Sequence, residues 1–203
     1  IVLLPTSAQS NTATFTVTAT DNGTVSSVTL SGATYSSKSG NNWIFTKVYS
    51  YVNFSFGDST DTLTATATDG FGNTTTSSIS MVVRKSDDQS PVISNLVADD
   101  TSIELKTSSQ SQTVTFTVSA SDNRSISTVS LPGTTPGSVS GNNYTFTKSY
   151  SYSSYSFGSS SDTLTATVTD AAGNSATDTI TVNISKSDDQ NPSISSFSVD
   201  DST

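Results

Sequence analysis

Aspartate side chains are the residues of this chain whose chemistry stands out. Two adjacent aspartates lie in the linker 85–91, and others follow predicted strands near 113–121 and 162–169. Carboxylate and amide oxygens are the ligands of Ca²⁺, which takes six to eight of them at ~2.3–2.6 Å. The sequence therefore predicts a calcium site at the joint between two domains. The candidate ligands are Asp87, Asp88, Asp122, Asn123, Asp170 and Asn174.

The same residues have a second interpretation that needs no metal. Asp and Asn tolerate the backbone geometry of turns, so they are common in loops for that reason alone. A pair such as Asp87-Asp88 also keeps a linker solvated. For another pair, Asp99-Asp100, the favoured interpretation is a kink that ends one strand and begins the next. The sequence leaves calcium and turn geometry as alternatives at the linker.

Catalysis is not expected from this composition. The chain has no histidine and no cysteine, and no serine or threonine stands in a motif that supplies a base for a nucleophile. The absence of cysteine also removes disulfides and zinc–thiolate sites. We predict that the protein is not an enzyme.

Charge and polarity indicate the location of the protein. Eight basic residues stand against 17 acidic ones, which gives a formal net charge of −9, so we expect no binding to nucleic acid. Glu104 is the single glutamate, and Ser and Thr in place of Lys and Glu make the surface neutral and hydroxylated. This pattern predicts an extracellular or cell-surface protein, secreted from a bacterium. No apolar stretch reaches the ~18 residues of a membrane span.

An internal repeat organises the chain. Residues 12–102 match residues 113–203 without a gap, at an offset of 101 residues (12 to 113). At the front edge the match is interpreted as slipping by one residue, so that Ile1 corresponds to Ile103. Two copies predict a tandem array.

Strict alternation of apolar residues with threonine predicts strands and essentially no helix. Phe15, Val17 and Ala19 alternate with threonines, which favour extended backbone. The predicted fold class is all-β: two tandem immunoglobulin-like antiparallel β-sandwiches of about seven strands each. In the second copy the expected strands are 92–98, 103–106, 113–121, 126–131, 143–150, 162–169 and 177–185; in the first they are 12–20, 25–30, 42–49, 61–68 and 76–84.

The segments 62–83 and 163–184 share a threonine-rich strand, then Asp-x-x-Gly-Asn, then a second strand. This block resembles the last hairpin of the bacterial immunoglobulin-like (Big-type) domains repeated along giant surface proteins and adhesins. The resemblance implies a sandwich used as a stalk, extender or binding module, often stiffened by calcium between domains. In such a topology the linker enters beside the loops that carry Asp122 and Asp170.

The repeat boundaries predict three parts: domain 1 at 1–86 without its own first strand, domain 2 at 87–187, and a linker with an orphan first strand at 188–203. The orphan strand, 191–203, contains the assembly residues Ile194, Phe197 and Val199. Inserted into a neighbouring unit, it would complete that unit's sheet by strand addition. We expect neighbouring copies of the same repeat or subunit as partners.

Two classes of function follow. The first is a structural module that forms a stalk or filament from end-to-end domains, joined either by peptide bonds or by exchanged strands. The alternative is an adhesive binding module for carbohydrate or a host protein, for which the aromatic runs 49–57 and 150–158 would supply exposed rings. Because each copy has such a run at the same place, a structural role for them is favoured.

Overall fold

The structure is a computed structural model that describes residues 1–200. The chain divides into two compact units, unit 1 at Ile1–Gln89 and unit 2 at Ser90–Thr203. Strands dominate both units, and the described helical residues form two short 3₁₀ turns, Tyr51–Asn53 and Tyr152–Ser154. The all-β prediction is confirmed.

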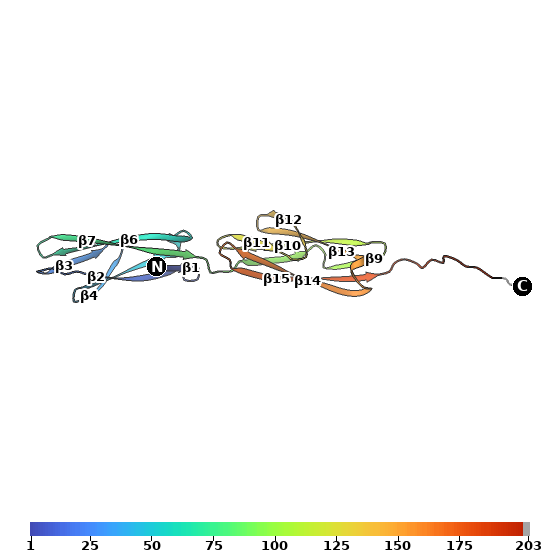
Figure 1. Ribbon diagram of the computed structural model, residues 1–203, viewed down its shortest axis with the longest axis horizontal. Helices are drawn as coiled ribbons and strands as arrows, with labels where there is room; N and C mark the ends of the chain where they lie inside the picture. The colour runs from blue at the N-terminus through green and yellow to red at the C-terminus, as the bar shows by residue number, and fades with distance from the viewer. Residues whose placement is uncertain (201–203) are drawn as a thin grey trace. The chain divides into compact units, whose positions relative to one another are not determined.

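Unit 1 is a sandwich of a four-stranded and a three-stranded sheet (Figure 1). The first sheet has the order β1-β7-β6-β3, with β1 parallel to β7 and the other pairs antiparallel. The second has the order β2-β5-β4, so β2 is an edge strand. Its strands are β1 (Val2–Pro5), β2 (Ser10–Thr18), β3 (Val25–Leu30), β4 (Thr34–Ser39), β5 (Asn42–Ser50), β6 (Gly57–Asp69) and β7 (Thr74–Ser86).

Unit 2 repeats this plan with one more strand (Figure 1). Its sheets have the orders β12-β13-β10-β8 and β11-β14-β15-β9. The additional strand β8 pairs antiparallel with β10, while β9 pairs parallel with β15. Its strands are β8 (Val92–Ala98), β9 (Ser102–Lys106), β10 (Ser111–Ser121), β11 (Ile126–Ser130), β12 (Thr135–Ser140), β13 (Asn143–Ser151), β14 (Gly158–Asp170) and β15 (Ser175–Ser187).

Alternation along the strands produces the two cores. In β10 the even-numbered Val114, Phe116, Val118 and Ala120 are buried, whereas the intervening residues are half-buried. Burial of each large apolar side chain stabilises the sandwich by about 1.5–3 kcal/mol relative to exposure. The period of two therefore predicts both the strands and the face that each one buries.

The sequence prediction missed β4 and β12. All six residues of each strand are exposed, so neither carries the alternation that identifies a half-buried strand. Each is instead an edge strand held by backbone pairing to its neighbour, β5 or β13. Unit 2 therefore has eight described strands where about seven were expected.

The predicted slip at the front edge is wrong. In unit 1, Val2 pairs with Val83, and in unit 2 Ile103 pairs with Ile184, the residue that matches Val83 at the repeat offset. The offset of 101 therefore continues into β1, and Val2 rather than Ile1 corresponds to Ile103. The slip placed an apolar residue of β1 on the wrong face, which burial of Val2 excludes.

The kink at Asp99-Asp100 is confirmed. Strand β8 ends at Ala98 in one sheet, and β9 begins at Ser102 in the other. An oxygen of Asp99 accepts a hydrogen bond from the backbone N–H of Thr115, and one of Asp100 accepts from that of Ser102. These carboxylates stabilise the crossing between sheets.

Candidate functional site

A groove runs along the free edge of β2 in unit 1. Its largest part is a cavity of about 450 Å³ between β2 and strands β6 and β7, with Phe15, Leu63 and Ile79 among its apolar lining. A second cavity of about 260 Å³ continues it past Val17 and Ala67. The groove presents unpaired backbone groups of an edge strand beside apolar side chains, which is the arrangement that accepts an added strand.

Unit 2 shows what fills this place in the fold. There β8 pairs with β10, so that Ala98 lies opposite Phe116 and Leu96 opposite Val118. Ile93, Leu96 and Ala98 pack on the core, and Phe116 is fully buried. Its unit 1 counterpart Phe15 is only half-buried. The described residues of unit 1 contain no strand at the position of β8.

The predicted assembly residues lie in a segment without regular structure. Residues 188–200 form no described strand. Ile194, Phe197 and Val199 are 85%, 97% and 88% exposed. At the repeat offset they correspond to Ile93, Leu96 and Ala98, the three residues by which β8 packs on its core. The last three residues of the predicted strand, 201–203, lie outside the described residues.

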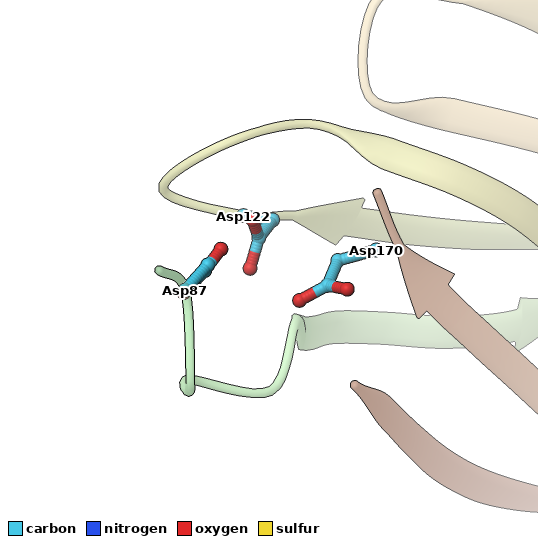
Figure 2. Close-up of side chains that lie close together, drawn as sticks. All are labelled: Asp87, Asp122 and Asp170. Atoms are coloured by element: carbon cyan, nitrogen blue, oxygen red, sulfur yellow. The ribbon is translucent and has the colours of Figure 1, made fainter. Parts of the chain in front are cut away.

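The acidic loops of unit 2 come together at one end of that sandwich. Asp122 follows β10 and Asp170 ends β14, and one carboxylate oxygen of each lies within 4.8 Å of the other (Figure 2). An oxygen of Asp122 accepts the backbone N–H of Arg124 at 2.7 Å. Figure 2 also draws Asp87, which belongs to unit 1.

Asp170 organises its own turn. Its Oδ1 accepts the backbone N–H groups of Ala172 and Asn174, each at 2.8 Å, and its Oδ2 accepts the Asn174 side-chain amide at 2.8 Å. Burial opposes ionisation of Asp170, but these hydrogen bonds outweigh it and lower its pKa below the ordinary 3.8. Asp69 of unit 1 makes the same bonds within its turn, and the Asn73 side chain lowers the pKa of Asp69 most.

The linker aspartates hold a turn of their own unit. Asp87 accepts the Thr6 hydroxyl at 3.0 Å, and Asp88 accepts the backbone N–H of Ser7 at 2.9 Å as well as the Ser7 hydroxyl. In unit 2, Asp188 and Asp189 make the same contacts with Thr107 and Ser108. Sequence reasoning missed these contacts. The signal that could have found them is that a Thr-Ser pair precedes an Asp-Asp pair by 81 residues in both copies.

The candidate metal ligands therefore divide between the units. Within unit 2, Asp122 and Asp170 are aspartates that could hold a metal ion, whereas Asp87 belongs to unit 1. Asp88 lies on Ser7, and the Asn174 amide nitrogen donates to Asp170. Asn123 is exposed in the loop after β10. Hard, anionic oxygens suit Ca²⁺.

A lysine–aspartate–tyrosine cluster recurs in both units and was not predicted. In unit 1, Asp61 Oδ2 accepts from Lys47 Nζ at 2.8 Å and from the Tyr49 hydroxyl at 2.6 Å. Burial, reinforced by the hydrogen bond to Asp61, raises the pKa of Tyr49. Lys148, Tyr150 and Asp162 form the equivalent cluster. Tyr49 and Tyr150 are buried, so these members of the aromatic runs are core residues.

Acid should destabilise both units through their paired turn aspartates. Because the pKa values of Asp69 and Asp170 are lower in the folded chain than their ordinary 3.8, their stabilisation is complete above that value. It is lost as the pH falls through the lowered folded values. Thermal unfolding followed by circular dichroism from about pH 6 to about pH 2 should show the decrease.

The matched variant for this effect is Asp170→Asn, which cannot ionise. It should reduce the acid dependence of unit 2 while that of unit 1 persists through Asp69. Equal melting temperatures of the unchanged protein at both ends of this pH range would contradict the assignment.

No family model matches the chain, and no curated protein matches it. Among solved structures it is similar to protocadherin gamma B2 extracellular cadherin domains 3–6, with 17% identity over 90% of this chain and 45% of that chain, at a TM-score of 0.41. It is also similar to PcdhgB3 EC1-4, with 15% identity over 76% and 37% and a TM-score of 0.34. A third is the sialic acid binding region of a Streptococcus sanguinis SK1 adhesin, with 11% identity over 92% and 76% and a TM-score of 0.31. The chain spans less than half the length of these two protocadherin structures. None of the helices described is long and apolar enough to cross a membrane.

Proposed function

We propose that the chain is a structural module of an extracellular array in which β-sandwich units follow one another and complete each other's sheets. The observation that carries this proposal is the groove of unit 1, together with an exposed segment whose sequence repeats the strand that fills the same place in unit 2. The proposed occupant is segment 193–199 of a neighbouring copy.

The pairing within unit 2 gives the register of the added strand. Transferring the β8–β10 register by the repeat offset places Val199 opposite Phe15, Phe197 opposite Val17, and Ile194 opposite Ala19. Phe15 and Val17 are half-buried residues of the edge strand β2, and the half-buried Ala19 directly follows it. The added strand would therefore cover the groove with its three exposed apolar side chains.

The expected gain is large on the scale of domain stability. Burying three large apolar side chains contributes about 1.5–3 kcal/mol each, before the cost of ordering the segment and of association. Strand addition also pairs the backbone groups of β2. A covalent array and a strand-exchanged filament share this geometry, since the same segment enters the same groove in each.

Calcium fits the donors of the acidic loops, and we include it in the proposal as an ion at the joint. The support is the donor chemistry: two carboxylates of unit 2 within 4.8 Å of each other and a third aspartate, Asp87, in the segment that leads into unit 2. Asp122 and Asp170 would bind the ion, and Asp87 would add a ligand. Bound there, Ca²⁺ would restrain the joint and stiffen the array.

The stalk role is favoured over adhesion to carbohydrate or a host protein because the buried tyrosines of the aromatic runs belong to the cores.

The test of strand addition between copies is sedimentation velocity on the full chain over a range of concentrations. We expect species whose mass increases with concentration. A 21.0 kDa monomer at every concentration would contradict strand addition between copies.

A further inference from the structure

The segment that would enter unit 1 differs from β8 in side-chain size. The groove that would receive it differs in the same respect from the corresponding residues of unit 2. Resting on the proposed strand addition, we propose that Phe197 of one copy fits a pocket of a second copy's unit 1 that is enlarged at Ala67. The partner is thus a second copy of this chain, and the fit at this pocket selects the strand and its register.

On the acceptor side, one cavity of the groove differs from unit 2 in its apolar lining. The cavity of about 260 Å³ is lined by Val17, Ala19, Ala65 and Ala67 together with threonines and Ser77. At the repeat offset, the first three correspond to residues of the same type in unit 2, whereas Ala67 corresponds to Val168. Val168 is fully buried in its unit, and Ala67 is half-buried.

On the strand that would be added, one side chain is larger than its counterpart in unit 2. Ile194 matches Ile93 in type, but Phe197 stands where β8 has Leu96. The transferred register places Phe197 opposite Val17, which lines this cavity. A larger residue on the strand therefore meets a smaller residue in the groove.

Close packing makes this exchange informative. Core positions tolerate changes best when the total volume is conserved, and inserting extra methyl groups beside a large side chain forces strain. Leu96 packs against the core cluster that contains Val168, and Phe197 would pack against the core that contains Ala67, so the two pairs would be two solutions to one packing problem. The mixed pair of Phe197 with valine would be overpacked, and the pair of leucine with Ala67 would leave a void.

A double-mutant cycle in trans tests the fit. The acceptor is the full chain carrying Ile194→Asp and Phe197→Asp, so that its own tail does not compete, with or without Ala67→Val. The probe is a fluorescein-labelled peptide of residues 188–200, unchanged or with Phe197→Leu, and the readout is fluorescence anisotropy. Unit 2 has valine at this position, so the fold accepts Ala67→Val, and thermal unfolding checks that acceptor.

We expect Ala67→Val to weaken the unchanged peptide about tenfold and to weaken the Phe197→Leu peptide clearly less. Equal effects on both peptides, or no effect on either, would overturn the size matching while leaving strand addition in place. A failure of every peptide to bind the acceptor with Ala67 would overturn both proposals.

Discussion

Replacing Ile194 and Phe197 with aspartate should abolish self-association of the full chain. Both side chains are almost fully exposed, 85% and 97%, so the substitutions cost the isolated chain no packing. In the added strand the same positions face the groove, where an unpaired carboxylate against Phe15 and Leu63 would be strongly unfavourable. Loss of the apolar burial and this desolvation together should reduce the association constant at least a hundredfold.

Sedimentation velocity on the variant and the unchanged chain, at equal concentration, measures this effect. The matched control is Ser196→Asp with Ser198→Asp, which adds the same charge at alternate positions that the register turns toward solvent. We expect that control to assemble. Assembly by the Ile194→Asp, Phe197→Asp variant would show that copies associate through another surface.

Removal of calcium should lower the stability of unit 2 and its joint. A ligand that binds only the folded chain at a hundred times its dissociation constant adds about 2.7 kcal/mol. We therefore expect millimolar Ca²⁺ to raise the unfolding temperature by several degrees, and a chelator to reverse the rise. Asp122→Asn should abolish the response because it would remove one of the two carboxylates of unit 2 that are proposed to bind the ion.

The control for calcium is Asp21→Asn, the same substitution in the corresponding loop of unit 1. The control is made in the Ile194→Asp, Phe197→Asp chain, which should not assemble. There the linker of another copy does not reach that loop, so Asp21→Asn should leave the calcium response unchanged. Mg²⁺ at the same concentration should give a smaller shift, since it demands near-ideal octahedral geometry. An unfolding temperature that is independent of Ca²⁺ would leave turn geometry as the role of these aspartates.

The strands with alternating residues could be predicted because a period of two carries the information in the residues themselves. Val114, Phe116 and Val118 show which face is buried before any partner strand is known. Strands β4 and β12 could not be predicted this way, because all of their residues are exposed and neither strand shows alternating burial. Alternation could not set the register at β1, because residues 1–4 are all apolar; only the structure shows that Val2 and Leu4 are the buried ones.

The candidate sites were predictable to different degrees. Turn chemistry placed Asp122 and Asp170 in loops, and the topology of a sandwich brings those loops to one end. The hydrogen bonds from Thr6 and Ser7 to the linker aspartates join positions 81 residues apart in sequence, which no local pattern reveals. The orphan strand stays a prediction from the repeat, since residues 188–200 form no described strand, whereas the groove depends on the packing of β2 on β3, β6 and β7.

The most direct test of strand addition is a disulfide between two copies. The transferred register places Thr16 of one copy opposite Ser198 of another, where opposed Cα atoms lie about 4.5–5.5 Å apart, within disulfide range. The chain has no cysteine of its own, so Thr16→Cys with Ser198→Cys adds the only thiols.

After mild oxidation, a non-reducing gel should show a ladder of covalent oligomers that a reductant collapses to the monomer. Thr16→Cys with Ser193→Cys, out of register, should give little ladder. Equal ladders from both pairs, or none from either, would contradict the proposed strand.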